Sequence, residues 1–191
     1  MIDEFPAGLF FLRHCKSEYN AAHKISGQAN PSVISLSIDA AALEVDSVQY
    51  QDLTIISSPL ARCLQTVLCL MEQYRKIQSH LYIDGRIMER RMGCWEGRLK
   101  ADVIRQFPQH CYCGNINPLC APPGGETIDE FAARIVDFTQ SLKTVSKERP
   151  ILICAHNQSL KLLKYQLIGH TDFLSFWTSC SFQNGKVERI Y

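Results

Sequence analysis

Two short apolar runs, each ending in a histidine, constrain this chain more than any other feature. The first strand candidate covers residues 8–14 and ends in Arg13-His14, and the second covers residues 150–156 and ends in His156. A run of this length without polar alternation is typical of a strand buried on both faces, as in a parallel sheet. We therefore expect two parallel strands whose carboxyl ends place both histidines on one rim, where open α/β sheets bind ligands.

The segments between these runs predict alternating strands and helices. Two further strands are expected at residues 53–58 and 80–84, and helices are expected at residues 39–45, 60–75, 100–107, 127–147 and 158–168. This alternation favours an α/β fold, a three-layer α/β/α sandwich around a mostly parallel central sheet.

Several local signals set the expected boundaries of these elements. Ser58 followed by Pro59 predicts one helix start, and Thr127 with Glu130 forms a capping box at another. Gly169 is expected to stop the helix before it. Residues 108–125 predict a long loop that shapes a cleft, and Asn184-Gly185 predicts a hairpin over residues 181–191 at the sheet edge.

Composition limits the class of protein. The 191 residues are 46% hydrophobic and 20% charged, which predicts one globular domain over residues 1–191. The formal net charge of +1 argues against nucleic acid as a partner. An acidic start and the lack of an apolar run of about 20 residues predict a cytoplasmic protein without a membrane segment.

The cysteines predict a reduced interior more than a metal site. Nine cysteines are present, and several of them fall within apolar periodic stretches, where a thiol acts as a small hydrophobic group. Cys111, Cys113 and Cys120 lack the paired C-x-x-C spacing of zinc sites, so we interpret them as loop cysteines.

Four cationic or potentially cationic side chains are expected at the rim of the sheet. Arg62 falls in the first turn of the helix after the second strand, at the same edge as Arg13, His14 and His156. Taken singly, each has a plainer interpretation, such as an exposed helical arginine or a charged pair where a strand surfaces. Together, on a nearly neutral protein, they suit a small dianion.

Five short motifs resemble signature blocks of the histidine phosphatase superfamily, which includes the phosphoglycerate mutases. They are Arg13-His14-x-x-Ser17-x-x-Asn20, Ser57-Ser58-Pro59-Leu60-x-Arg62-x-x-Gln65-Thr66, Glu89-x-x-x-Gly93-x-Trp95-Glu96-Gly97, Pro123-Gly124-Gly125-Glu126-Thr127 and Ile153-Cys154-Ala155-His156-Asn157. One such block would be weak evidence, but the five run in family order from residue 9 to about 168.

The resemblance implies a phosphoglycerate mutase-like fold and a metal-independent phosphatase. It implies that His14 attacks phosphorus and forms a phosphohistidine, and that Glu89 protonates the leaving oxygen and then activates water. Arg13, Arg62 and His156 are implied to meet the charge of the phosphoryl group, in the place of a metal ion.

The same resemblance implies further substrate-binding groups. Asn20, the backbone amides near Gly27 and the amide of Asn157 are expected to bind the phosphate beside Arg13 and Arg62. The implied partner is a small phosphorylated metabolite, with no cofactor, and the oligomeric state is left open. Trp95 is interpreted as a packing anchor.

Two alternatives stay open. The family's glycine after Arg-His is Cys15 here, which is expected to narrow the pocket or expose it to oxidation and which admits a degenerate, non-catalytic phospholigand-binding protein. The short span of residues 98–122 favours hydrolysis, whereas Glu89-Arg90 followed by Lys100 is partly mutase-like. Phosphoglycerate mutase-type transfer is therefore the alternative activity.

Overall fold

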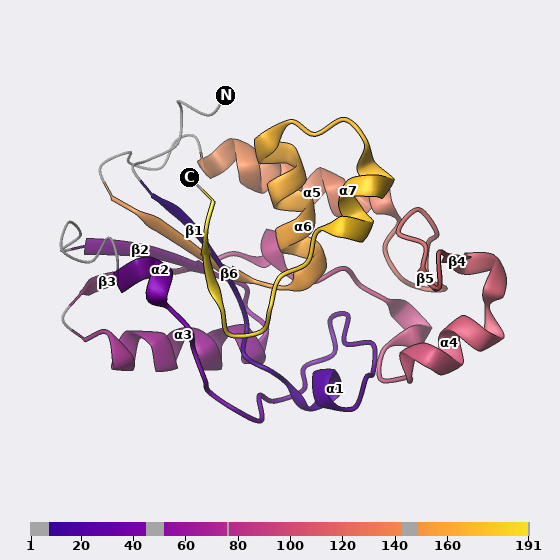
Figure 1. Ribbon diagram of the computed structural model, residues 1–191, viewed down its shortest axis with the longest axis horizontal. Coiled ribbons are helices and arrows are strands. Elements are labelled where there is room, and N and C mark those ends of the chain that lie inside the picture. The colour runs from indigo at the N-terminus through magenta and orange to yellow at the C-terminus, as the bar shows by residue number, and fades with distance from the viewer. Residues whose placement is uncertain (1–7, 45–51, 76, 143–148, 191) are drawn as a thin grey trace.

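The structure is a computed structural model that describes residues 8–44, 52–75, 77–142 and 149–190. Its centre is a five-stranded sheet with the strand order β3-β2-β6-β1-β7 (Figure 1). The strands are β1 (Leu9–Arg13), β2 (Asp52–Ser57), β3 (Gln78–Ile83), β6 (Ile151–Ala155) and β7 (Val187–Arg189). β3, β2, β6 and β1 pair in parallel, and β7 is antiparallel to β1. The predicted α/β class with a mostly parallel sheet is confirmed.

The two apolar runs occupy neighbouring positions in the sheet, β1 beside β6. Their register pairs Leu9 with Ile151 and Arg13 with Ala155. All of β6 and the first four residues of β1 are at most 1% exposed, so both faces of each strand are covered. Burial on both faces explains why these strands lack polar alternation.

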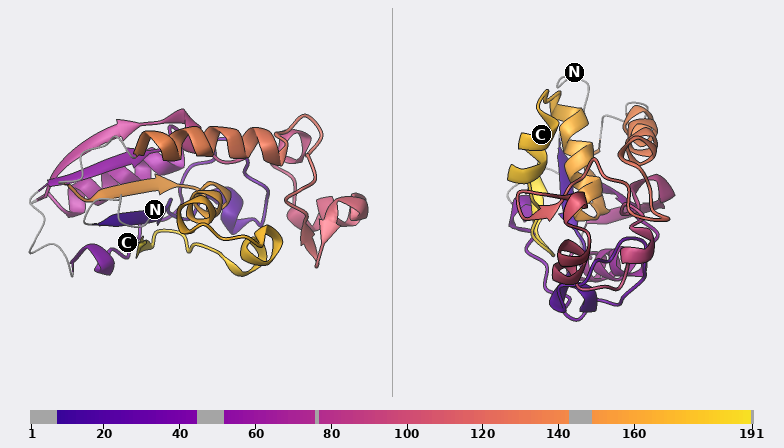
Figure 2. Two further views of the ribbon diagram at one scale, coloured as in Figure 1. Left: turned by 90° about the horizontal axis from the view of Figure 1, so that it is seen from above. Right: turned by 90° about the vertical axis from the view of Figure 1, so that its right-hand side faces the viewer.

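Helices cover both faces of the sheet, which makes three layers (Figure 2). On one face lie α2 (Ala41–Glu44) and α3 (Ala61–Gln73), and on the other lie α5 (Ile128–Leu142), α6 (Asn157–Ile168) and α7 (Phe173–Ser179). β1 shows the division residue by residue, because Phe10 and Leu12 pack on the α3 side while Leu9 and Phe11 pack on the α5–α6 side.

Smaller elements gather beyond the carboxyl ends of the parallel strands (Figure 1). They are α1 (Glu18–Ala21), α4 (Lys100–Gln106), a two-stranded sheet of β4 (Cys111–Tyr112) and β5 (Asn115–Ile116), and 3-10 turns at Gly85–Ile87, Gly93–Trp95 and Pro108–His110. Trp95 is fully buried, with its ring centroid 5.5 Å from that of Phe107. Its predicted role as a packing anchor is confirmed.

Two predictions of secondary structure were wrong, and one helix was missed. Residues 108–125 were expected to lack regular structure but contain β4, β5 and a 3-10 turn, and α7 was not predicted. The predicted terminal hairpin does not form, although Gly185 adopts the left-handed φ of 72° expected of the turn. β7 instead pairs with β1, matching Phe10 to Arg189. This pairing covers the hydrogen-bonding edge of a buried strand, which a local hairpin would leave open.

The helix boundaries follow the predicted signals except at α3. The capping box is confirmed, because Thr127 N donates to Glu130 and Glu130 N donates to Thr127 Oγ1. Gly169 ends α6 with a left-handed φ of 66°. Ser58 was expected to cap α3, but the cap residue is Leu60 and the helix begins at Ala61, while the Ser58 hydroxyl lies 2.8 Å from the His156 ring.

Parts of some predictions fall on residues that the structure does not describe. The expected helix ends at residues 45 and 143–147 lie outside the described residues. One domain over residues 1–191 likewise stays a prediction. Among the described helices, none combines the length and the apolar character that crossing a bilayer requires.

Candidate active site

Three predicted side chains meet at the carboxyl edge of the sheet. Arg62 Nε lies 3.2 Å from His14 Nε2 and 3.1 Å from His156 Nδ1. The two imidazole centroids are 5.1 Å apart, and each of the three residues is at most 3% exposed. α3 follows β2 almost at once, so its first turn carries Arg62 over the ends of β1 and β6. The predicted convergence of these groups is confirmed.

The hydrogen bonds of the two imidazoles define where their protons lie. His14 Nδ1 is 2.7 Å from the Cys15 carbonyl oxygen, which only accepts, so Nδ1 carries the proton. His14 Nε2 then offers its lone pair and accepts from Arg62 Nε. His156 has the opposite tautomer, because its Nδ1 accepts from Arg62 and its Nε2 donates to Ser58 Oγ.

Burial and positive charge keep both imidazoles neutral. Burial lowers the pKa of His14 well below its usual value, and the charge of Arg62 lowers it further. The same two causes, in the same order, lower the pKa of His156. A neutral imidazole whose Nε2 carries no proton is the nucleophilic form of histidine.

The guanidinium of Arg62 is held by backbone carbonyls. Its Nη1 donates to Ala29 O at 2.7 Å and its Nη2 donates to Gly27 O at 2.9 Å. Burial lowers the pKa of Arg62, whereas the charges of Glu89 and Glu96 raise it. An arginine stays charged in proteins, so this cluster keeps a buried positive charge at its centre.

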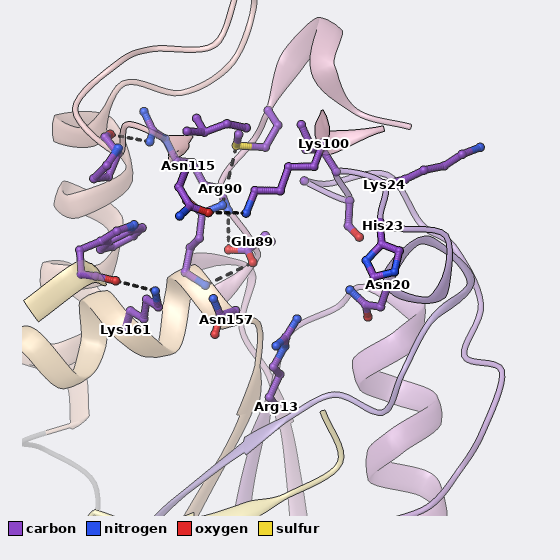
Figure 3. Close-up of a pocket in the computed structure, with 18 of the residues that line it drawn as sticks. Arg13, Asn20, His23, Lys24, Glu89, Arg90, Lys100, Asn115, Asn157 and Lys161 are labelled. Carbon is purple, nitrogen blue, oxygen red and sulfur yellow. Dashed lines mark hydrogen bonds between the residues drawn. The ribbon is translucent and has the colours of Figure 1, made fainter. Parts of the chain in front are cut away.

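Arg13 presents a second guanidinium beside the cluster. Its Nη1 donates to the Phe182 carbonyl at 2.7 Å, while its buried Nε has no hydrogen-bond partner within the described parts of the chain. The guanidinium points into a cavity (Figure 3). An arginine with an unsatisfied buried donor is suited to an anionic ligand.

The cavity has a volume of about 380 Å³. Four other predicted site residues line it besides Arg13, namely Asn20, Gly27, Glu89 and Asn157. The opposite wall carries Lys100 on α4, which donates to Asn115 on β5 at 2.7 Å (Figure 3). The lining does not include His14, Arg62 or His156. Arg13, which precedes His14 in the chain, lines the cavity next to this group.

Glu89 faces the cavity from the side of α6. Its carboxylate accepts hydrogen bonds from Arg90 N at 3.0 Å, Gln158 N at 3.3 Å and Ser159 Oγ at 3.4 Å. These contacts place the carboxyl group of Glu89 at the amino end of α6. Glu89 is 8% exposed, so solvent reaches only a small part of it.

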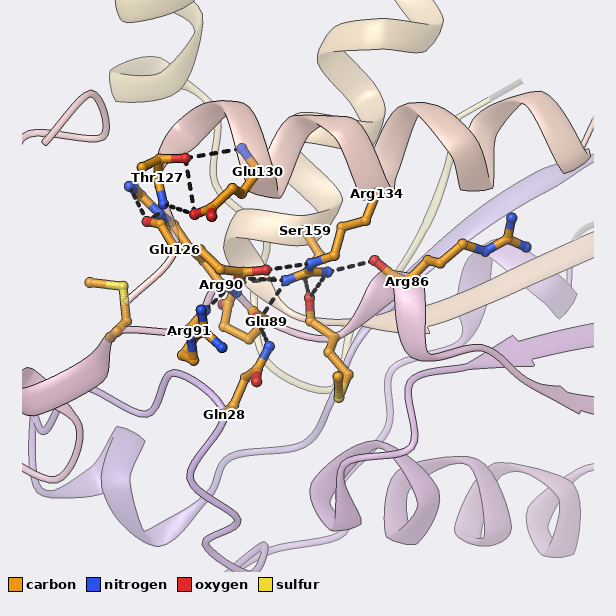
Figure 4. Close-up of polar contacts among 12 residues, drawn as sticks. Gln28, Arg86, Glu89, Arg90, Arg91, Glu126, Thr127, Glu130, Arg134 and Ser159 are labelled. Atoms are coloured by element: carbon orange, nitrogen blue, oxygen red, sulfur yellow. Dashed lines mark hydrogen bonds and ion pairs between the residues drawn. The ribbon is translucent and has the colours of Figure 1, made fainter. Parts of the chain in front are cut away.

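The backbone around Glu89 is held by an arginine from α5. Arg134 donates to the carbonyl oxygens of Met88 at 2.7 Å and Glu89 at 2.9 Å, and it forms an ion pair of 2.9 Å with Glu126 (Figure 4). The charges of Arg134 and Arg91 and the hydrogen bonds from both residues lower the pKa of Glu126, which partial burial alone would raise. The Pro-Gly-Gly-Glu motif thus supports the loop that carries Glu89.

The two asparagines present their amide nitrogens to the cavity. Asn20 Oδ1 accepts from Ser17 N and Ser17 Oγ, and Asn157 Oδ1 accepts from Phe182 N. In both side chains the oxygen is thereby engaged, which leaves the Nδ2 donor for a ligand.

The expectation that backbone amides near Gly27 bind the phosphate does not hold for the two that follow it, and binding at Gly27 itself, which lines the cavity, stays a prediction. The amides of Gln28 and Ala29 donate to the Glu96 carboxylate, and Gly27 directs its carbonyl at Arg62. Residues 27–29 therefore contact Arg62 through their carbonyl oxygens, because the amides of Gln28 and Ala29 are already paired with Glu96.

Cys15 does not narrow the cavity, contrary to the expectation from sequence. Its thiol is 1% exposed and points to the Ser37 carbonyl at 3.5 Å, and Cys15 is not among the lining residues. Its amide donates to Thr66 Oγ1 at 2.8 Å.

Ser58, Glu96 and Arg134 were missed as contributors to the site. Ser58 and Glu96 stand in the quoted motifs, so position within a motif was a signal for both. Arg134 had no such signal, because its contact with the Glu89 loop depends on how α5 packs. In the described parts of the chain, no three His, Cys, Asp or Glu side chains form a group that could hold a metal ion.

A comparison with family models identifies one family for this chain. The model described as histidine phosphatase superfamily (branch 1) matches residues 9–190. A glucosyl-3-phosphoglycerate phosphatase of Mycolicibacterium vanbaalenii is 28% identical over 169 residues, covering 84% of this chain and 74% of the relative. Phosphoserine phosphatase 1 of Hydrogenobacter thermophilus is 24% identical, covering 89% and 80%. The solved mycobacterial glucosyl-3-phosphoglycerate phosphatase complexed with VO3 shares this fold, with a TM-score of 0.75 at 22% identity, covering 95% of this chain and 90% of the other.

Proposed function

This chain belongs to branch 1 of the histidine phosphatase superfamily, and from that premise we propose that it hydrolyses a small phosphate monoester through a phosphohistidine on His14. One observation carries the proposal. The bond between His14 Nδ1 and the Cys15 carbonyl keeps the proton on Nδ1, so Nε2, which accepts from Arg62 Nε, carries none, in a ring that burial keeps neutral. That atom can form a bond to phosphorus without first losing a proton.

The reaction has two steps. His14 Nε2 attacks phosphorus in line, and the bond from phosphorus to the alcohol oxygen breaks as a protonated Glu89 gives that oxygen its proton. Water then attacks the phosphohistidine while the Glu89 carboxylate takes a proton from it. The phosphorus–nitrogen bond breaks, inorganic phosphate leaves, and both side chains return to their starting states. The position of Glu89 in the cavity wall beside Arg13 supports this role.

Positive charge from the protein is proposed to replace a metal ion. Arg62 and Arg13 bring two permanent charges to the edge of the sheet, and His156 shares the Arg62 Nε donor with His14. These groups are proposed to stabilise the negative charge on the equatorial oxygens of the transferring phosphoryl group. We expect dialysis against EDTA to leave the rate unchanged, and a rate restored only by added Mg²⁺ would contradict metal independence.

The substrate is proposed to be a small phosphorylated metabolite. The relatives named above carry phosphatase names for small phosphorylated compounds. A cavity of about 380 Å³ holds a metabolite and is at the small end of ligand pockets. Arg13, Asn20 and Asn157 are proposed to bind its phosphate, together with Arg62.

The experiment compares His14→Ala with the wild-type protein. We expect hydrolysis of p-nitrophenyl phosphate to fall by about 10⁴-fold or more, because the covalent route is lost. Calorimetry should still detect inorganic phosphate binding, because both arginines remain. His23→Ala, which changes an exposed histidine of the same cavity, is the matched control. Unchanged turnover in His14→Ala would remove the mechanism.

The same preparation separates hydrolysis from mutase-type transfer. With 3-phosphoglycerate as substrate, we expect release of inorganic phosphate rather than conversion to 2-phosphoglycerate. Only residues 98–122 lie between the Glu89 motif and the Pro-Gly-Gly-Glu motif, which leaves little chain to close the site against water. Efficient isomerisation without phosphate release would favour the mutase, and phosphate binding by a wild-type protein that shows no turnover would favour a non-catalytic binding protein.

A further inference from the structure

The carboxylate of Glu96 holds three backbone amides next to the site. Its Oε1 accepts from Gln28 N at 3.0 Å and from Met92 N at 2.8 Å, and its Oε2 accepts from Ala29 N at 2.9 Å. Glu96 does not line the cavity, so it is not placed to touch a substrate there. A carboxylate that accepts three backbone hydrogen bonds fixes the peptides that donate them.

The other side of the same segment faces Arg62. The carbonyl oxygens of Gly27 and Ala29 accept from the guanidinium at 2.9 and 2.7 Å. Asn30 Oδ1 also accepts from Ala61 N, the first residue of α3, at 2.7 Å. Residues 27–30 therefore form a bridge between Glu96 and the arginine that contacts both imidazoles.

Gly27 shows how closely the bridge approaches Glu96. A Cβ atom at Gly27 would lie 2.2 Å from Glu96 Oε1 and 2.7 Å from its Cγ, and the φ of Gly27 is +49°. Any residue larger than glycine is disfavoured at this position, both by the close approach of Glu96 and by the positive φ. The contact leaves no room for the bridge to move toward Glu96.

The bridge also reaches Glu89, and Glu96 is itself firmly placed. Gln28, whose amide donates to Glu96, directs its side-chain Nε2 to the Glu89 carbonyl at 3.1 Å. Glu96 follows Trp95, which is fully buried, and its own amide donates to Gly93 O at 3.1 Å. The Glu96 carboxylate is thus connected, through residues 27–29, to the side chain of Arg62 and to the backbone of Glu89.

We propose that Glu96 is a positioning residue that, through the backbone of residues 27–29, fixes the Arg62 guanidinium where it meets the transferring phosphoryl group. This inference rests on the proposed function and deepens it. A carboxylate suits the role because both oxygens only accept. Glutamine would turn an NH₂ donor toward at least one backbone N–H, so at least one of the three contacts is lost in Glu96→Gln.

Orthovanadate binding tests the proposal without requiring turnover. When a nucleophile bonds to its vanadium, vanadate adopts the trigonal arrangement of oxygens that a transferring phosphoryl group passes through, so its affinity reports the placement of Arg62. We expect Glu96→Gln to raise the vanadate Kd by about tenfold or more, because small displacements of positioned groups have large effects. Glu130→Gln is the matched control, since Glu130 also accepts a backbone hydrogen bond but does so at the start of α5. Its Kd should equal that of the wild type.

A double-mutant cycle separates positioning from a purely structural role. In an Arg62→Lys background, the forked contacts to Gly27 and Ala29 are gone, so we expect Glu96→Gln to change the vanadate Kd by less than about threefold. If Glu96→Gln has the same effect in both backgrounds, or has less than a threefold effect in the wild type, Glu96 does not act through Arg62 and the proposal is overturned.

Gly27→Ala disturbs the contact between Glu96 and residues 27–29 from the Gly27 side, and it tests the proposal if Glu96→Gln does not fold. The added Cβ must displace the bridge from Glu96, so we expect a similar rise in the vanadate Kd in a variant whose far-ultraviolet circular dichroism is native. An unchanged Kd in folded Gly27→Ala would overturn the proposal. A wild-type protein that binds vanadate but hydrolyses no monoester would contradict the proposed function while leaving this comparison of Kd values intact.

Discussion

The floor and the outer wall of the site are built in different ways. The floor consists of His14, Arg62 and His156, all at most 3% exposed and joined by hydrogen bonds at the strand ends. The outer wall consists of loop and helix-start residues around Lys24, Lys100 and Asn115, which are exposed. Buried, mutually held groups suit chemistry that must not vary, whereas exposed groups on loops suit recognition that can vary.

The number of partners per side chain shows the contrast. Arg62 has four hydrogen-bond acceptors, two ring nitrogens and two carbonyls. On the wall, Lys100 donates to Asn115, and Lys24 lies 5.5 Å above the Tyr19 ring. Removing a floor group therefore disturbs several others, while removing a wall group affects mainly its own contact with a ligand.

After the loss of the nucleophile in His14→Ala, the next largest effect is expected at Glu89, which stands where wall and floor meet. Glu89→Gln cannot protonate the leaving oxygen, so we expect kcat/KM for an alkyl phosphate, which reports formation of the phosphohistidine, to fall by about 10²- to 10⁴-fold. The loss should be much smaller for p-nitrophenyl phosphate, whose phenolate leaves without protonation. Steady-state kinetics with both substrates checks this, and an equal loss for the two would contradict proton donation by Glu89.

The floor histidines should make stability depend on pH. Both have lowered pKa values in the folded protein, so below pH 6.5 the unfolded chain takes up protons that the folded chain does not. Each histidine is then expected to remove about 1.4 kcal/mol of the unfolding free energy per pH unit as pH falls from 6.5 toward its folded pKa. Above pH 6.5 neither contributes to this dependence.

Urea unfolding at pH 7.5, 6.5 and 5.5 measures this slope. His156→Gln should reduce it, because one buried imidazole is gone, whereas His23→Gln on the exposed wall should retain the wild-type slope. Equal slopes in His156→Gln and the wild type would show that the floor histidine takes up a proton as readily when folded as when unfolded.

A smaller effect is expected on the wall. Lys100→Ala should raise KM for an acidic monoester by about threefold to tenfold and leave kcat unchanged, because an exposed ammonium contributes modest, salt-screened attraction. Kinetics at low and high ionic strength checks this, and the difference from the wild type should shrink in high salt. A fall in kcat with unchanged KM would mean that the wall takes part in the chemical step.

The smallest effect is expected at Cys15, beside the nucleophile but turned away from the cavity. Burial raises the pKa of its thiol, which keeps it protonated and unreactive. Cys15→Ala should keep kcat/KM within about twofold of the wild type and lower the unfolding free energy by about 1 kcal/mol, as for other small buried deletions. Activity assays before and after peroxide treatment, with urea unfolding, check both values. A large loss of kcat would show that the side chain shapes the site.

The floor could be predicted from the sequence almost completely. His14 and His156 end strands whose burial is visible as continuous apolar runs, and parallel pairing brings such ends to one rim. Arg62 was predictable because α3 follows its strand within a few residues. These placements depend on local chain geometry and on one rule of topology, so no knowledge of side-chain packing was needed.

The supporting contacts could not be predicted in this way. Arg134 reaches the Glu89 loop from α5, and Phe182 and Asn184 hold Arg13, Asn20 and the carbonyl of His14 from the other end of the chain. The direction of the Cys15 thiol and the pairing of β7 with β1 could not be predicted either. Each depends on how segments distant in sequence pack against one another.

By itself, the sequence determined the parallel strands, most of the helices around them, and which residues end the central strands, because hydrophobic periodicity and strand–turn–helix spacing are local properties. The tertiary structure decided the protonation pattern of the imidazoles, the partners of both arginines, and the link from Glu96 through residues 27–29 to Arg62. Hydrogen-bond partners are selected by three-dimensional proximity within a desolvated site, and periodicity along the chain does not contain that information.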